Sequence, residues 1–186
     1  MAAATLTRDD VARRILSAFR QYGYEGASLA RLSSATGLGR SSLYHYFPNG
    51  KEDMANAAIA FVASWFADNV LPALAGNDPP AERLARLSIQ MARFYEQGQA
   101  ACLMDVFTIG EAGLVFQAAL GERMRLLIKL LSGVAQEAGV PAEEADRRAQ
   151  DVMIGIQGSL IVSRALGSTA PFLRVCSIIS HLLLED

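Results

Sequence analysis

Six side chains with polar tips surround a single leucine in the segment 40–46, which reads RSSLYHY. Arginine is the usual bidentate partner of guanine, serine bonds bases or phosphates, and tyrosine hydroxyls reach phosphate oxygens. Such side chains make poor core material, because buried polar groups must find hydrogen-bond partners. The segment therefore predicts an exposed surface whose chemistry suits nucleic acid.

Two short predicted helices position this segment. Ser28 is a plausible N-cap of the first helix, and Gly37 ends it and permits a tight turn. In the second helix Leu43 and Phe47 are four residues apart, so both face inward and anchor it. Two short helices joined by a glycine-containing turn outline a helix-turn-helix, in which the second helix enters the DNA major groove.

Helical periodicity recurs along the chain, and no segment alternates as a strand does over its whole length. Thr7 is the expected N-cap of a first helix that ends near Gly23, and a long helix is expected from about Lys51 to Leu71 with Pro72 just beyond it. The sequence predicts an all-α fold of about nine helices. Residues 1–54 are expected to form a helix-turn-helix head and residues 55–186 a helical body, with the helix from about residue 51 linking them.

Composition favours a folded protein with a basic head. The 186 residues are 52% hydrophobic and 19% charged, and the net charge is −2. Residues 1–54 carry seven Lys or Arg against five Asp or Glu, a balance of +2, and the remainder carries ten against fourteen, a balance of −4. A mildly basic head on an acidic body is the distribution expected when the head meets phosphate.

Cys102 and Cys176 are the only cysteines. Two distant thiols form neither a zinc site nor a disulfide framework, so we expect both to be buried as small hydrophobic residues. No apolar run approaches the roughly 20 residues of a membrane span, and the start MAAATLTRDD lacks the features of a signal peptide. These observations predict a cytoplasmic protein without membrane contact.

Residues 7–54 resemble the DNA-binding domain of the TetR family of bacterial transcriptional repressors. The resemblance rests on AFRQYGYEGAS, SLARLSSATGL and RSSLYHYF, the last followed directly by PNGKEDM. Two positions depart from the usual pattern. Ser33 stands where alanine is common, and Gly50 lengthens the loop before Lys51 as in a branch that contains multidrug-efflux regulators.

The resemblance implies which residues of the head meet DNA. Ser28 and Lys51 would contact phosphates, since both lie at helix N-termini, where free N–H groups favour anions. Two alternatives stay open, namely that Tyr44 packs in the core and that His45 is merely solvated. The residues implied to face DNA are Arg40, Ser41, Ser42, Tyr44, His45 and Tyr46.

The resemblance also implies that the body binds a small effector and pairs two subunits through its last two long helices. Aromatic residues and methionines supply an apolar lining, and Gln157 is a candidate polar anchor. The expected effector-binding residues are Phe61, Trp65, Met91, Phe94, Tyr95, Met104, Phe107, Met153 and Gln157. The expected dimer-interface residues are Gly155, Gly158, Ser159, Val162, Phe172, Val175, Ile179 and Leu182. For both sets, ordinary core packing remains the alternative.

The sequence thus predicts a homodimeric repressor that binds a palindromic double-stranded DNA operator and is released by a small apolar or aromatic effector. The alternative is an all-α small-molecule-binding protein or enzyme with an incidental helix-turn-helix; an activator with the same fold is a third reading. No metal-ligand spacing, nucleophile–base pair or phosphate-binding glycine loop is visible in the sequence. We therefore predict no catalytic residue, no metal and no cofactor.

Overall fold

The computed structural model of the protein describes residues 6–185, and within them the chain forms nine α-helices, one short 3₁₀ helix and no strand. This confirms the predicted all-α fold. Residues 1–5 of the predicted head and residue 186 of the predicted body lie outside the described residues. The helices are α1 (Arg8–Gly26), α2 (Leu29–Thr36), α3 (Arg40–Tyr46), α4 (Lys51–Leu74), α5 (Pro80–Phe94), η1 (Glu96–Gly98), α6 (Leu103–Phe107), α7 (Gly110–Glu137), α8 (Ala142–Leu166) and α9 (Ala170–Leu184).

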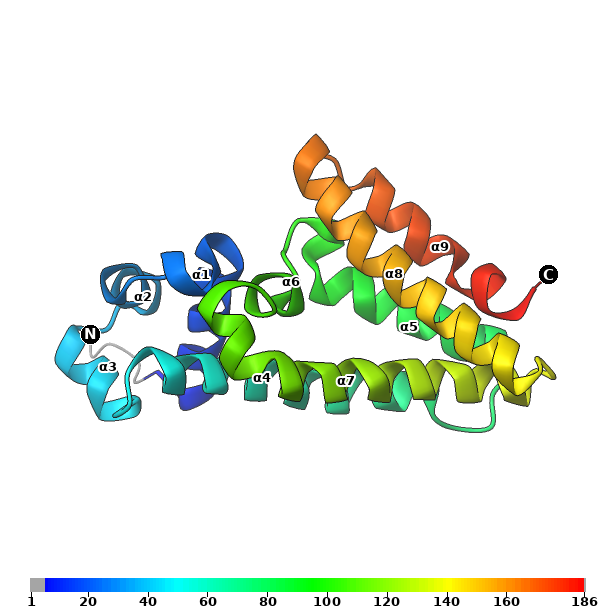
Figure 1. The fold of residues 1–186 in the computed structure, drawn as a ribbon, viewed down its shortest axis with the longest axis horizontal. Coiled ribbons are helices and arrows are strands. Elements are labelled where there is room, and N and C mark those ends of the chain that lie inside the picture. The colour runs from blue at the N-terminus through cyan, green and yellow to red at the C-terminus, as the bar shows by residue number, and fades with distance from the viewer. Residues whose placement is uncertain (1–5, 186) are drawn as a thin grey trace.

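Figure 1 shows a small head at one end, formed by α1 to α3, and a larger body that extends away from it, with the C-terminus at the far end. The body packs α4, α5, α7, α8 and α9 around one apolar cluster. A second cluster fills the head and continues into α6 and the first half of α7. Apolar contacts of this second cluster cross the boundary predicted after residue 54. That boundary stays a prediction.

The first helix begins as its sequence predicts. The backbone N–H of Asp10 donates to Thr7 Oγ1 over 3.1 Å, and the N–H of Thr7 donates to the Asp10 carboxylate over 3.2 Å. These reciprocal bonds form a capping box. The apolar stripe Val11, Ile15 and Phe19 is fully buried. Gly23, with φ of +70°, interrupts the helix, and the chain then makes one more turn to Gly26.

The end of α1 is tied to the start of α7. Glu25 Oε1 accepts from the N–H of Glu111 over 2.8 Å and from the N–H of Ala112 over 3.3 Å. A carboxylate is favourable there, because the N-terminus of a helix carries unpaired N–H groups and a partial positive charge. Gly110 makes room for this contact, since a Cβ at that position would lie 2.6 Å from Glu25 Oε1. We call this contact the Glu25 clasp.

The fourth helix runs past the end expected from sequence. It continues through Pro72 to Leu74, although proline cannot donate a hydrogen bond to the preceding turn. Arg83 of α5 donates Nη1 to the carbonyls of Leu74, the last residue of α4, and Gly76, over 3.1 and 3.3 Å. The guanidinium also pairs with Glu137 of α7. A buried arginine thus satisfies the last carbonyls of one helix and joins it to two others.

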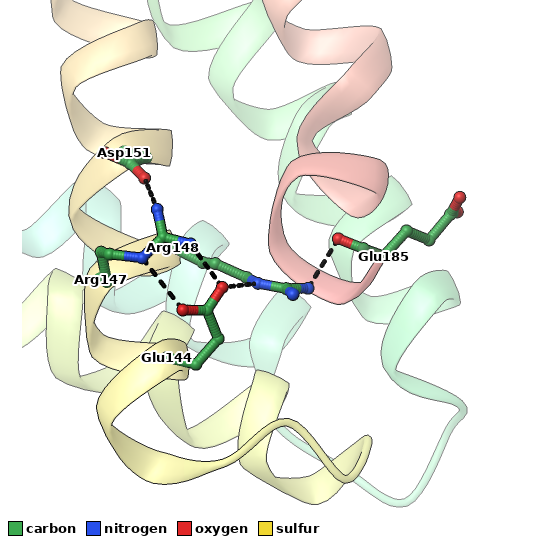
Figure 2. Close-up of polar contacts among 5 residues, drawn as sticks. All are labelled: Glu144, Arg147, Arg148, Asp151 and Glu185. Carbon is green, nitrogen blue, oxygen red and sulfur yellow. Dashed lines mark hydrogen bonds and ion pairs between the residues drawn. The ribbon is translucent and has the colours of Figure 1, made fainter.

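A group of charged residues closes the far end of the body, where α8 begins and α9 ends (Figure 2). Arg148 donates Nε to Glu144 over 2.6 Å and Nη1 to the Glu185 carbonyl over 2.6 Å. Arg147 donates to Glu144 and, over 3.0 Å, to Asp151. Hydrogen bonds from Arg147 and Arg148 lower the pKa of Glu144 from 4.5 to about 2. Through its bond to the Glu185 carbonyl, Arg148 therefore ties the start of α8 to the end of α9.

One described helix, α4, has the length and the mean hydropathy, 1.5, of a membrane-crossing segment, although no apolar run in the sequence predicted one. A core helix passes the same test. Here α4 packs against α1 and α5, and several of its apolar side chains face an internal cavity described below.

Candidate functional site

The helix α3 displays polar side chains on an apolar anchor. It has seven residues, begins after Gly39 and is held by Leu43 and Phe47, both fully buried. A helix this short is not stable alone, because isolated helices need about 12–15 residues. Its position therefore depends on these two anchors. The exposed residues of α3 are Arg40, Ser41, Ser42, Tyr44 and His45.

The two tyrosines of α3 differ in their availability. Tyr44 is 49% exposed, so it does not pack in the core of the head. Tyr46 is half-buried; its hydroxyl lies 3.5 Å from the carbonyl of Leu6, and its ring packs against Phe47. Tyr44 is therefore free to meet a partner, whereas Tyr46 also supports the N-terminal segment.

Side chains of α1 and α2 fix the turn before α3. Thr36, which is fully buried, donates its hydroxyl to the Leu32 carbonyl over 2.8 Å. Ser33 Oγ donates to the Leu38 carbonyl over 2.6 Å, and Arg14 Nη1 donates to the Thr36 carbonyl over 2.9 Å. These bonds satisfy carbonyls that the turn leaves unpaired. Ser33, the residue that departs from the usual pattern, thus bridges the turn with a bond that alanine lacks.

The two residues expected at helix N-termini lie there, and both already have protein partners. Ser28 is the N-cap of α2, and its hydroxyl accepts from the N–H of Arg31 over 3.3 Å. Lys51 is the first residue of α4, and its Nζ donates to the Tyr24 carbonyl over 3.1 Å and lies 4.5 Å from the centre of the Tyr24 ring. Lys51 therefore holds the end of α1 as well as standing near the head surface.

The body contains a cavity of about 240 Å³ between α4, α5, α7 and α8, with an almost wholly apolar lining. Its volume is close to the lower end of ligand pockets, about 300–1,000 Å³. Six of the nine residues expected to bind an effector line it. They are Met91, Phe94, Tyr95, Met104, Met153 and Gln157.

The structure places the other three expected residues elsewhere. Phe61 and Trp65 border a groove between head and body, on a different face of α4. Phe107 is fully buried among the aromatic rings of the head, 5.0 Å from the centroid of Phe19 and 5.2 Å from that of Phe116. Helical spacing shows that these residues face inward, but it does not tell which internal space each one borders.

Several lining residues were not expected, chiefly those of α7. Their aliphatic side chains look like ordinary core residues in sequence, so only the assembled bundle reveals their place. The unexpected lining residues include Leu120, Arg123, Leu126, Leu127 and Ile156.

Polar groups at one end of the cavity are few and buried. The Tyr95 hydroxyl donates to Cys102 Sγ over 3.4 Å, and burial raises the pKa of Tyr95 well above its usual range. Burial also raises the pKa of the Cys102 thiol. Gln157 Oε1 is buried, and no protein group within residues 6–185 bonds to it. Because buried polar atoms are normally paired, this amide is the natural point for a polar ligand group to bond.

Of the residues expected at a dimer interface, some are exposed and some are not. Gly158 and Val162 of α8 are exposed, and Gly155, Val175 and Leu182 are half-buried. The remaining three belong to the chain's own interior, where α8, α9 and α5 pack together. Phe172 and Ile179 are fully buried and Ser159 is 7% exposed.

Residues 10–58 match the family model described as bacterial regulatory proteins, tetR family. Two relatives from Bacillus subtilis (strain 168) align over most of their length. The HTH-type transcriptional regulator LmrA is 24% identical over 94% of this chain and 97% of its own. The uncharacterized HTH-type transcriptional regulator YxaF is 20% identical over 91% of each chain.

Solved structures share the whole fold. A TetR transcriptional regulator from Legionella pneumophila superposes with a TM-score of 0.82 at 18% identity, covering 98% of this chain and 100% of its own. A cysteine mutant of the TetR family transcriptional regulator CifR, complexed with a 26 bp double-strand operator DNA, superposes with a TM-score of 0.74 at 21% identity over 97% of each chain. The N-terminal domain, residues 10–58, is thus that of the tetR family of bacterial regulatory proteins, and the whole chain shares the fold of solved TetR transcriptional regulators.

Proposed function

We propose that this protein is a DNA-binding transcriptional repressor whose helix α3 reads the operator. The observation that carries the proposal is the display of Arg40, Ser41, Ser42 and Tyr44 on a helix held by two buried anchors. The CifR relative of the same fold is complexed with operator DNA. Arg40 is the residue best suited to read a base, because its guanidinium matches the two acceptors of guanine. We also propose that the protein acts in the cytoplasm, where its DNA lies.

The test is a comparison of specific with random DNA. A binding sequence is first selected from a random duplex library, and its affinity is measured by fluorescence anisotropy. Arg40→Ala should weaken binding to the selected sequence by about 10- to 100-fold, as expected for loss of a bidentate base contact. Binding to random DNA should change much less. Equal losses on both sequences would refute the base-reading role of Arg40.

Arg125→Ala serves as the control, since Arg125 is an exposed arginine of the body helix α7. It should leave both affinities unchanged. The same assay separates a regulator from an all-α enzyme or carrier. Turnover of a small molecule by a protein that selects no DNA sequence would favour the enzyme.

We infer that two chains pair through α8 and α9. Exposed apolar side chains recur along one side of α8 at helical spacing, and α9 adds one more. Soluble monomers rarely leave such an apolar surface uncovered. They are Ile154 (68% exposed), Ile161 (51%), Val162 (45%), Leu166 (68%) and Ile178 (37%). Two such helix pairs around a two-fold axis make a four-helix bundle. Val162→Glu should shift the protein to monomer in sedimentation, whereas Val115→Glu on α7 should not.

We infer that the cavity binds a small, uncharged and mostly apolar effector. Its lining is apolar, and Gln157 Oε1 would accept a hydrogen bond from the ligand. The cavity borders α7, whose first turn is bonded to α1 through the Glu25 clasp. An effector that favours a different placement of α7 would move the head and lower operator affinity.

A further inference from the structure

A groove separate from the cavity runs between the head helix α1 and the body, with a volume of about 1040 Å³. Its lining is strongly cationic for a chain of net charge −2. Five of its fifteen lining residues are arginines, and Glu96 is the only acidic one among them. An electropositive groove with low-dielectric walls concentrates anions.

Three of these arginines already bond protein oxygens. Arg13 pairs with Asp10 over 3.1 Å, and Arg164 bonds Asp105 over 3.3 Å. Arg14 donates to the turn before α3. Arg20 differs from them, because its Nε and Nη2 are buried and donate to no partner within residues 6–185. These two atoms form one edge of the guanidinium, the edge that offers two parallel N–H groups to a carboxylate.

The surroundings of Arg20 are aromatic. Its Cζ lies 4.5 Å from the centroid of the Phe94 ring and 5.9 Å from that of Tyr95. The Trp65 ring lies 4.5 Å from Phe94, tilted by 34°. Aromatic faces attract the cation, yet they offer no acceptor for its N–H groups. Burial lowers the pKa of Arg20, because it removes the charged guanidinium from water. An acceptor supplied by a ligand would satisfy this edge, and the rings would pack against its apolar part.

We propose that this groove is a second ligand site, for a small organic anion that carries a carboxylate on a planar aromatic body. The carboxylate accepts from Nε and Nη2 of Arg20, and the aromatic body packs against Phe94 and Trp65. The site goes beyond the effector cavity, because its anchor belongs to the head. Phe94 borders both spaces, so the two ligands share one wall.

The test uses benzoate as the probe and the full-length chain. Trp65 is the only tryptophan, so its fluorescence reports on the groove directly. We expect benzoate to change this fluorescence with a saturating curve. Benzamide has the same ring without the charge, and inorganic phosphate has the charge without the ring. Both should bind at least tenfold more weakly than benzoate.

Variants assign the binding to Arg20. Arg20→Gln keeps a polar side chain but removes the charge and one edge of the fork, and it should weaken benzoate binding at least tenfold. Arg125→Gln should not, since Arg125 lies on α7 and does not line the groove. Gln157→Leu alters the effector cavity and should leave benzoate binding unchanged, so failure of the cavity proposal is distinguished from failure of this one.

Three results would overturn the proposal. They are unchanged benzoate affinity in Arg20→Gln, equal binding of benzamide, and equal binding of phosphate, which would mean an adventitious ion only. If circular dichroism shows that Arg20→Gln does not fold, Arg20→Lys replaces it. Lysine keeps the charge and loses the planar fork, so benzoate should bind about fivefold more weakly. Unchanged affinity in Arg20→Lys would then refute the bidentate contact.

Discussion

Replacing Leu43 with alanine removes the inner anchor of α3 without touching its exposed face. Leu43 is fully buried, and leucine-to-alanine changes at such sites cost about 2–5 kcal/mol. With seven residues, α3 is too short to be stable as an isolated helix. We therefore expect the free energy of unfolding to fall by about 3 kcal/mol.

The same change should reduce operator binding, although Leu43 itself does not reach DNA. If docking α3 must be driven by binding, each 1.4 kcal/mol of that cost weakens the affinity about tenfold. A cost of about 3 kcal/mol therefore predicts a loss on the order of 100-fold. Urea unfolding followed by circular dichroism measures the first quantity, and fluorescence anisotropy with the selected operator measures the second.

Ser42→Ala is the matched control, since Ser42 is the exposed neighbour on the same helix. Its stability should stay within about 0.5 kcal/mol of the original protein, while its operator affinity falls if Ser42 contacts DNA. Unchanged stability and unchanged operator affinity in Leu43→Ala would refute the reasoning, because α3 would then be held by something other than its buried anchor.

Three further predictions follow from single contacts. Lys51→Ala should lower the free energy of unfolding by about 1 kcal/mol, because its contacts with Tyr24 are lost. It should also reduce the salt dependence of DNA binding by about one counterion. An unchanged salt dependence would show that Lys51 has only a structural role. Glu144→Gln should lower the melting temperature at neutral pH. The difference from the original protein should vanish as pH falls from 4.5 towards about 2, because the stabilising charge of Glu144 is lost across that range. A difference in melting temperature that persists at low pH would count against this role of Glu144, and Glu143→Gln is the control. Ser33→Ala should cost about 1 kcal/mol by removing the bond across the turn, as measured by urea unfolding, and no loss would show that the turn is held without it.

The head was predictable because its signals are local. Thr7 and Ser28 cap helices where the sequence places them, and the spacing of Leu43 and Phe47 fixes which face of α3 is buried. Even Tyr44, for which core packing stayed open, follows from that spacing, since it lies next to Leu43 and turns outward. In a short helix, the positions of the buried anchors determine which neighbouring side chains are exposed.

The body was harder, because its contacts join residues far apart in the chain. The spacing of apolar residues predicts that Phe107 is buried. It does not show whether Phe107 packs in the aromatic cluster of the head or lines the cavity. Pro72 appeared to end α4, yet the helix continues to Leu74, whose carbonyl accepts a hydrogen bond from the distant Arg83. The unpaired edge of Arg20 is likewise invisible in sequence, because an arginine near an apolar stripe usually extends to solvent.

The Glu25 clasp has a mechanical consequence. A helix of 28 residues such as α7 is about 42 Å long and behaves as a rod. Glu111, at the clasped end, is twelve residues from Arg123 in the cavity wall, or about 18 Å along the rod. A tilt of about 3° pivoting at the cavity therefore displaces the clasped end by about 1 Å. In the two-fold dimer proposed above, the partner rod would tilt in the opposite sense, so the spacing of the two α3 helices would change by up to twice that amount.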